Sequence, residues 1–340
     1  MTNDRPTVVV LRALGLGDLL TAVPALRGLA AAFPEHRKVL AAPKHLAPLA
    51  ALSGAVDDVV DAHLDAPLDS SLERPDVAVN LHGRGPKSHA AVLALRPARL
   101  IAFTDPDIEE TKGFPVWDTE EHDVSRWCRL LHDFGIAADP SGLDLDPPAV
   151  DAPPHAVGAT VLHPGAKDPN RRWARDRWVA VAKAEAGAGR RVVLTGSSNE
   201  AALGEQIAAR AGLDDTAVLA GRTDLLQLAA VVAKARVLVS NDTGVAHLAT
   251  AVRTPSVVLF GQMSPAQWGP PPSRPIHRAI WKGPRPGAGS AELLAAIEVD
   301  EVLEAIWGVA PTAASRDIGA PPARPGALLA AMGGEGDEPR

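Results

Sequence analysis

The 340-residue chain contains no tyrosine and a single cysteine, Cys128. A disulfide needs two thiols and a thiolate metal cluster usually needs more, so one cysteine excludes both within the chain. We interpret Cys128 as an ordinary helix residue beside Trp127. The absence of tyrosine accompanies an abundance of alanine, arginine, proline and glycine. We interpret it as compositional bias and draw no chemistry from it.

Long apolar runs and positive charge are also lacking. No apolar stretch approaches the ~20 residues that a membrane-spanning helix needs, and residues 1–6 lack the apolar core of a signal peptide. The net charge of −7 disfavours binding to nucleic acid in bulk. The content of 46% apolar and 22% charged residues is ordinary for a soluble globular protein. The length suits two domains of ~150 residues each.

A strand followed by a glycine turn stands near the start of the chain. Residues 8–11 are Val-Val-Val-Leu, which predicts a buried parallel strand. Gly15 and Gly17 then allow a tight turn close to a ligand. Apolar residues at helical spacing predict a helix that starts near Asp18. The Asp18 carboxylate therefore lies at the sheet edge where α/β proteins bind ligands, and local sequence leaves both a helix cap and a catalytic group open.

The glycine pattern fits a dinucleotide-binding fingerprint only in part. That fingerprint needs a third glycine, where this chain has Leu20, and an acidic residue after the second strand. The second strand is predicted at residues 38–42 and is followed by Pro43 and Lys44. An NAD(P)-dependent oxidoreductase is therefore a less favoured alternative.

Strand-like and helix-like runs alternate along the whole chain, which predicts an α/β fold with mostly parallel, doubly wound sheets. Strands are expected at 7–14, 38–42, 58–61, 76–82, 100–103, 159–163, 190–195, 217–219, 236–240 and 256–260. Helices are expected at 21–32, 46–52, 88–95, 117–134, 178–188, 200–211, 223–235 and 292–307, with Asp300 as a restart in the last one.

A proline-rich connector at residues 147–154 divides this pattern into two halves. We predict a first domain at 1–150 and a second at 151–310, which face each other across a cleft suited to a ligand. Residues 311–340 are rich in Pro, Ala and Gly and poor in large apolar groups, so we expect a disordered tail there.

Two clusters of cations follow predicted strands. Residues 80–88 hold His82, Arg84, Lys87 and two glycines before a helix start, which suits an anion; a plain turn with a cap is the alternative. Residues 162–173 place a glycine turn before Lys167, Arg171 and Arg172. The planar fork of arginine matches phosphate oxygens, and the position after the first strand of the second half favours a phosphate site over a solvated loop.

A further cluster closes a buried strand at residues 239–249. The strand ends in Ser-Asn-Asp242, and Thr243 and Gly244 then open a helix. Free N–H groups and the positive end of the helix dipole suit a diphosphate without a metal. The alternatives are that Asp242 only caps the helix and that His247 is a core histidine.

The glycine turn with Asp18 and these three clusters, in this order, resemble glycosyltransferase family 9, the ADP-heptose:lipopolysaccharide heptosyltransferase group. The resemblance covers about residues 8–307 and is most specific at Leu14–Asp18 and at Asn241–Gly244 followed by His247. It implies the GT-B fold of two Rossmann-like domains. It also implies an inverting transfer of heptose or a related sugar from a nucleotide-diphosphate donor, ADP-heptose, to a hydroxyl of a glycan or cell-envelope acceptor.

The resemblance also assigns roles. Asp18 matches the general base that takes the acceptor proton. Arg171 stands where the family has a phosphate-binding lysine, and Glu200 matches an acidic region near the donor ribose. The expected donor-binding residues are Lys167, Arg171, Glu200, Asp242, Thr243, Gly244 and His247, and the expected acceptor-side or anion-binding residues are Gly15, Gly17, His82, Arg84 and Lys87. The family's cysteine-rich stretch is replaced here by residues 282–287, and the acceptor domain varies most in such families, so the acceptor is the open part of this assignment.

The resemblance implies no cofactor and no metal. Asp105 and Asp107 have the form of an Asp-x-Asp metal motif but lie in the first domain, away from the donor site. The expected partners are a nucleotide-diphosphate sugar and a glycan or glycolipid acceptor, in the cytoplasm, with transient association with the inner membrane and without nucleic acid. The alternatives are a GT-B-type nucleotide-sugar epimerase and a non-catalytic nucleotide-sugar-binding protein; Asp18 argues against the latter.

Overall fold

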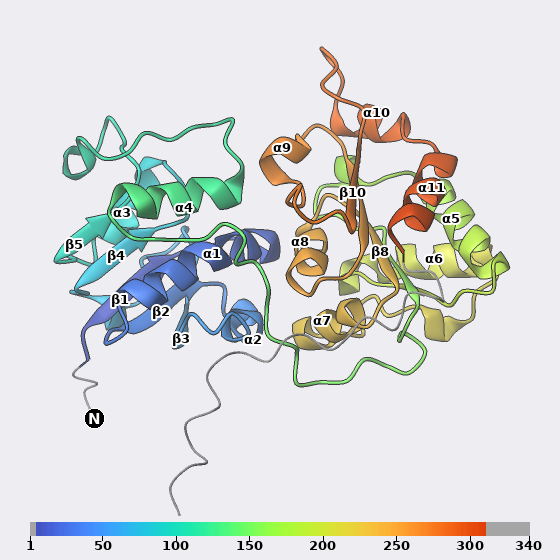
Figure 1. The fold of residues 1–340 in the computed structure, drawn as a ribbon, viewed down its shortest axis with the longest axis horizontal. Coiled ribbons are helices and arrows are strands. Elements are labelled where there is room, and N and C mark those ends of the chain that lie inside the picture. Colours follow the sequence, from blue (N-terminus) through green and yellow to red (C-terminus); the bar gives the residue numbers. More distant parts are fainter. Residues whose placement is uncertain (1–4, 311–340) are drawn as a thin grey trace, which may run out of the picture. The chain divides into compact units, whose positions relative to one another are not determined.

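Two five-stranded parallel sheets, one from each half of the chain, form the framework of the part that the structure describes, residues 5–310 (Figure 1). The structure is a computed structural model. The predicted α/β class with two doubly wound halves is confirmed. Each sheet has helices on both faces (Figure 1), because its right-handed crossovers run in opposite directions on the two sides of the central strand.

The first sheet has the strand order β3-β2-β1-β4-β5. The strands are β1 (Thr7–Leu11), β2 (Arg37–Ala42), β3 (Asp58–Asp61), β4 (Val77–Asn80) and β5 (Arg99–Ile101). β1 lies at the centre, paired in parallel with β2 and β4. Residues 8–11 of β1 are fully buried, which explains the uninterrupted run of Val and Leu there.

The helices of the first half differ from the predicted ones mainly at their ends. They are α1 (Leu16–Ala32), α2 (Ala47–Ala51), α3 (Pro86–Leu93) and α4 (Asp123–Asp133), with single 3-10 turns at Lys44–Leu46, Ser70–Leu72 and Glu109–Thr111. α1 starts two residues before Asp18. α4 starts six residues later than predicted, because the imidazole of His122 caps it by accepting the Val124 N–H.

The second sheet has the strand order β10-β9-β8-β6-β7. Its strands are β6 (Thr160–His163), β7 (Val192–Leu194), β8 (Val237–Asn241), β9 (Ser256–Phe260) and β10 (His277–Trp281). The strand predicted at 217–219 is wrong: these residues leave a 3-10 turn and make one isolated bridge, between Val218 and Leu194. β10 was not predicted because it is an edge strand with a mixed His-Arg-Ala-Ile-Trp sequence.

The helices of the second half surround this sheet. They are α5 (Arg175–Gly187), α6 (Ala201–Ala211), α7 (Leu225–Ala233), α8 (Gly244–Ala251), α9 (Pro265–Trp268), α10 (Ser290–Ala295) and α11 (Val299–Val309), with 3-10 turns at Pro169–Arg171, Ser198–Glu200 and Asp215–Ala217. The helix predicted at 292–307 with a restart at Asp300 is indeed divided into two helices, and the restart lies two residues earlier than predicted. The chain restarts at Glu298, whose N–H donates to the Glu301 carboxylate in a capping box.

A continuous apolar cluster joins the two halves of the chain. It runs from β1 and α1 to residues of α7 and α8, including Val245 and Leu248. α1 packs on α4 within the first half and on α8 of the second half. Residues up to Ala310 cluster as one unit by their contacts. The boundary near residue 150 therefore stays a prediction, and the predicted tail at 311–340 lies outside the described residues.

None of the helices described between residues 5 and 310 has the length and apolar character needed to cross a membrane.

Packing of α1 onto the segment after α4 depends on Gly28. A Cβ at this position would lie 2.7 Å from the carbonyl oxygen of Ala137 and 2.9 Å from the Cβ of Ala138. We therefore expect Gly28→Ala to lower the free energy of unfolding by about 1–3 kcal/mol, because the backbone must shift. Urea unfolding of the full chain measures the change.

Gly308 of α11 is the matched control. A Cβ there meets no heavy atom within 4 Å, so Gly308→Ala should raise the stability by about 0.5–1 kcal/mol through helix propensity alone. A Gly28→Ala protein as stable as the wild type would contradict the packing argument.

Candidate functional site

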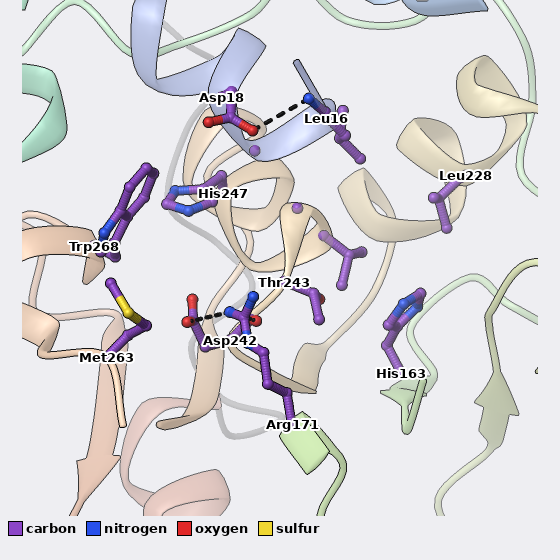
Figure 2. A pocket seen from close by; sticks show the side chains of 14 residues that line it. Leu16, Asp18, His163, Arg171, Leu228, Asp242, Thr243, His247, Met263 and Trp268 are labelled. Carbon is purple, nitrogen blue, oxygen red and sulfur yellow. Dashed lines mark hydrogen bonds and ion pairs between the residues drawn. The ribbon is translucent and has the colours of Figure 1, made fainter. Parts of the chain in front are cut away.

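A cavity of about 430 Å³ opens where the N termini of α1 and α8 meet (Figure 2). Its lining comes from both halves of the chain: Gly15, Leu16, Gly17, Asp18, His163, Arg171, Leu228, Asp242, Thr243, Gly244, Val245, His247, Met263 and Trp268. Eight of the predicted site residues line this cavity. They are the candidate base Asp18, the turn glycines Gly15 and Gly17, and the donor-binding candidates Arg171, Asp242, Thr243, Gly244 and His247.

Asp18 forms the helix cap that the sequence predicted and also lines the cavity, so its catalytic role stays a prediction. It is the third residue of α1, and its Oδ2 accepts the Gly15 N–H at 3.2 Å, so it closes the glycine turn. Its side chain is still 29% exposed and lines the cavity. Its other oxygen, Oδ1, lies 3.7 Å from Nη2 of Arg12. One carboxylate oxygen therefore holds the turn while the group as a whole remains accessible to a ligand.

The two helix N termini touch through glycines. A Cβ on Gly244 would lie 2.9 Å from the backbone nitrogen of Gly17, and a Cβ on Gly17 would lie 2.9 Å from Cδ2 of His247. Larger residues at either position would push the halves apart. Because both helices begin at the cavity, the positive ends of two helix dipoles converge there, an arrangement that favours an anion.

Arg171 and Asp242 form the opposite side of the cavity (Figure 2). Nη2 of Arg171 donates to Oδ2 of Asp242 at 2.5 Å and to its carbonyl oxygen at 2.6 Å. The Arg171 side chain stays 41% exposed, so part of its fork is free to meet a ligand. Asn241 fixes this arrangement, because its amide donates to the carbonyl of Pro164 at 2.9 Å and accepts the Trp173 N–H at 3.0 Å.

Two histidines line the cavity, and burial keeps both neutral. His247 lies beside the indole of Trp268, with ring centroids 6.4 Å apart, so it is a wall residue and not an enclosed core histidine. Burial lowers its pKa despite the nearby Asp242. His163, at the end of β6, has its Nδ1 3.0 Å from Thr195 Oγ1, and burial lowers its pKa to about 4. Neither ring adds positive charge at neutral pH.

Glu200 and Lys167 do not line this cavity. Glu200 accepts the N–H and the hydroxyl of Ser197, both at 2.8 Å, in a capping box before α6. Its carboxylate also covers Gly165, where a Cβ would lie 2.1 Å from Oε1. Glu200 therefore borders the loop after β6, while Lys167 is an exposed residue on that loop. Their donor-binding roles stay predictions.

The predicted anion cluster at 80–88 also lies outside the cavity lining. Arg84 and Lys87 are exposed in the turn that leads into α3. His82 is partly buried beside it, and burial and the nearby Arg12 lower its pKa. The anion-binding role of these three residues stays a prediction.

The Asp-x-Asp sequence has a local structural use. Asp105 is buried, and its Oδ1 accepts the Asp107 N–H at 2.9 Å, which closes a turn. Within residues 5–310, no group of three or more His, Cys, Asp or Glu side chains is placed to hold a metal ion.

Sequence reasoning missed the apolar wall of the cavity. Met263 and Trp268 lie on one side, and Leu228 lies across from them (Figure 2). Trp268 belongs to the single-turn helix α9, which is tied to the first half of the chain. Gln267 Nε2 donates to the Thr119 carbonyl at 2.9 Å, and His122 Nε2 lies 2.9 Å from the Gly269 carbonyl. A lone Trp in a Pro-rich loop carries no local signal for such a position.

The lowered pKa of His163 predicts a pH dependence of stability. In the unfolded chain His163 gains a proton near its ordinary pKa of 6.5, whereas the folded protein resists protonation until about pH 4. The unfolded state therefore binds more protons between these values, and folding stability falls as the pH drops through that window. We expect His163→Gln to reduce this loss by about 2 kcal/mol, measured as urea unfolding at pH 7 and at pH 4.5.

Urea unfolding of the wild type and of His163→Gln at pH 8 is the control, because His163 is neutral there in both the folded and the unfolded state. Parallel stability curves for the two proteins from pH 7 to 4.5 would contradict the prediction.

Comparisons with known proteins agree on one family. The family model for glycosyltransferase family 9 (heptosyltransferase) matches residues 116–285. Lipopolysaccharide heptosyltransferase 2 of Escherichia coli (strain K12) is 36% identical over 106 residues, 30% of each chain. Lipooligosaccharide heptosyltransferase 2 of Haemophilus influenzae is 36% identical over 112 residues, 32% of each chain. The chain thus spans about a third of the length of these curated relatives.

Solved structures resemble almost the whole chain. The structure of E. coli ADP-heptose lps heptosyltransferase II is 25% identical with a TM-score of 0.70, and the match covers 89% of this chain and 98% of that one. The family 9 glycosyltransferase from Veillonella parvula DSM 2008 is 17% identical with a TM-score of 0.71, covering 91% and 98%. The expected GT-B fold is confirmed. Since the family model matches residues 116–285, half of the 340-residue sequence, the chain belongs to glycosyltransferase family 9.

Proposed function

We propose that this chain is an inverting glycosyltransferase that transfers heptose from ADP-heptose to a hydroxyl of a cell-envelope glycan. One observation carries the proposal: the Asp18 carboxylate from the first half and the Arg171–Asp242–Gly244 group from the second half line the same cavity. A base and an anion-binding surface are thereby held on facing sides of one space. The 36% identity to lipopolysaccharide heptosyltransferase 2 and the likeness to the ADP-heptose heptosyltransferase II structure support this donor.

The second half supplies the donor site in this proposal. The diphosphate lies at the N terminus of α8, where Thr243 and Gly244 present free N–H groups and Arg171 adds its fork. His163 is neutral and half-buried, so it packs beside the nucleotide without adding charge. Glu200 and Lys167 border the same loop and extend the site toward the ribose. All these residues lie after residue 150, which supports the proposed boundary between an acceptor-side and a donor-side domain.

The first half supplies the base. Asp18 takes the proton from the acceptor hydroxyl, whose oxygen attacks the anomeric carbon on the face opposite the diphosphate. The bond from that carbon to the diphosphate oxygen breaks, and the electron pair leaves with ADP. The N–H groups of α8 and Arg171 stabilise the negative charge that develops on the leaving group. The residues named here require no cofactor for this chemistry.

The acceptor enters from the side of the first sheet in this proposal. The cations Arg84 and Lys87 are exposed there and suit an anionic glycan or glycolipid. Such an acceptor is presented at the inner membrane, so we place the enzyme in the cytoplasm with transient association with that surface.

Turnover of ADP-heptose tests the proposal, and Asp18→Asn tests the base. The wild type should release ADP from ADP-heptose in the presence of truncated lipopolysaccharide core oligosaccharides. Asp18→Asn should lower kcat by at least ~10²-fold, the usual scale for losing general-base help, with the ADP dissociation constant unchanged. Asparagine can still accept the Gly15 N–H, so the glycine turn is preserved.

Three outcomes contradict these statements separately. Near-normal kcat in Asp18→Asn would leave Asp18 as a helix cap and put the base elsewhere, with His82 next. Conversion of the donor to an epimer without transfer would favour the epimerase alternative. Binding of ADP without any turnover across the acceptor panel would favour a nucleotide-sugar-binding protein.

Removal of Arg171 should weaken ADP binding. Arg171→Ala deletes a cationic donor from the cavity and leaves Asp242, whose side chain is only 9% exposed, without its partner. We expect the ADP dissociation constant to rise on the order of tenfold or more, because a hydrogen bond to a charged group contributes about 1.5–3 kcal/mol. Calorimetric titration of the full chain with ADP measures it.

Arg175→Ala is the matched control. Arg175 is four residues away on α5 and bonds outward to Asp176 and Gln206, so its loss should leave ADP binding within twofold of the wild type. Equal affinities of the Arg171→Ala protein and the wild type would show that Arg171 does not meet the diphosphate.

A further inference from the structure

Arg12 is a buried cation that the proposed reaction has not used. It follows β1 directly, its side chain is 2% exposed, and it does not line the cavity. Charged side chains are almost never fully buried unless they are paired. Its guanidinium also lies over the Trp127 ring, 4.7 Å from the centroid. Arg12 is therefore fully buried although it contacts the candidate base, which lies six residues later in the chain.

The donors of Arg12 are directed at the start of α1. Nε donates to the Asp18 carbonyl at 2.9 Å, and Nη1 donates to the Leu81 carbonyl. Nη2 donates to Thr21 Oγ1 at 3.1 Å and lies 3.7 Å from Asp18 Oδ1. Arg12 therefore contacts Asp18 twice, through the main chain by a hydrogen bond and through the carboxylate by charge.

A buried carboxylate backs Arg12 from the other side. Asp123 Oδ2 accepts from Arg12 Nη2 at 2.8 Å and from the Thr21 hydroxyl at 2.7 Å, while Asp123 Oδ1 accepts from Arg126 at 3.0 Å. The side chains of Asp123 and Arg126 are 3% and 5% exposed. These three residues hold two positive charges and one negative charge. Asp18 adds a negative charge 3.7 Å from Arg12 at the edge of the cluster, and Glu121 adds another that acts on Arg126.

We propose that Arg12, held by Asp123 and Thr21, is a positioning residue for the Asp18 base. This inference rests on the proposed function. Arg12 fixes the Asp18 main chain against β1 and draws its Oδ1 toward a defined place, while Oδ2 is held by the Gly15 N–H. Arg12 does not line the cavity, so in this proposal it acts on the reaction through its contacts with Asp18.

The alternative is that Arg12 only braces β1, α1 and α4. A brace would affect stability, and any loss of rate would be the same with or without the Asp18 carboxylate. A positioning residue affects kcat only while that carboxylate is present. A double-mutant cycle separates the two roles.

The experiment compares Arg12→Met and Arg12→Lys in two backgrounds, wild type and Asp18→Asn. The readouts on the full chain are kcat for ADP release from ADP-heptose, with the core oligosaccharide acceptors, and the ADP dissociation constant. Arg12→Met should lower kcat on the order of 10²-fold in the wild type, because misplacement by about 1 Å costs that much. It should lower kcat less than about threefold in Asp18→Asn, with ADP affinity unchanged in both. Arg12→Lys should recover part of the rate.

Two further variants cover the structural role. Thr21→Val keeps every charge and the branched shape but removes the hydroxyl between Arg12 and Asp123, so it should lower kcat about fivefold only when Asp18 is present. If Arg12→Met does not fold, Thr21→Val distinguishes a positioning role of Arg12 from a purely structural one. Arg27→Met is the matched control: Arg27 also lies on α1 and binds carbonyls of Ser53 and Gly142, far from Asp18 along the helix, so kcat should not change.

Each result is decisive. Equal losses of kcat in both backgrounds, or a weakened affinity for ADP, would reduce Arg12 to a brace and overturn the inference while leaving the proposed function intact. A wild-type protein that releases no ADP with any acceptor would refute the proposed function, and this inference with it.

Discussion

The close approach of two glycines is the constraint on which the site depends. Gly17 and Gly244 let the first turns of α1 and α8 touch, and a single Cβ at either position would come within 3 Å of the opposite chain segment. This contact brings the Asp18 carboxylate and the N–H groups of α8 to one cavity. It also lets the apolar core run from one sheet to the other. In the proposed mechanism, neither half alone holds both the base and the anion-binding surface.

Part of the polar lining of the site could be predicted from sequence, because those residues follow strands whose carboxyl ends share one edge of a parallel sheet, whereas the lining residue His163 was not predicted. Asp18, Arg171 and Asp242 each stand just after such a strand, and the structure lines one cavity with all three. The contact between the halves could not be predicted, since no local pattern encodes which helix ends meet. The same holds for Trp268, which a short helix carries to the cavity wall, and for the edge strand His277–Trp281, whose pairing is tertiary.

The cap bond of Asp18 does not exclude the proposed role of Asp18 as a base. A carboxylate has two oxygens, and at Asp18 one of them closes the glycine turn while the side chain still lines the cavity. From local sequence alone, helix capping is a sufficient explanation for an aspartate at the start of α1. Here the cap bond and the Arg12 contact restrict the same side chain from two directions, which would suit the proposed base.

The attachment of α9 to the first half has a mechanical consequence. Gln267 and Gly269 belong to the second half by sequence, yet they are hydrogen-bonded to Thr119 and His122. Any hinge motion that separated the halves would have to break both bonds or carry the Trp268 wall along with the first half. On that side the cavity wall is therefore coupled to the first half of the chain, although its residues follow in sequence from the second half.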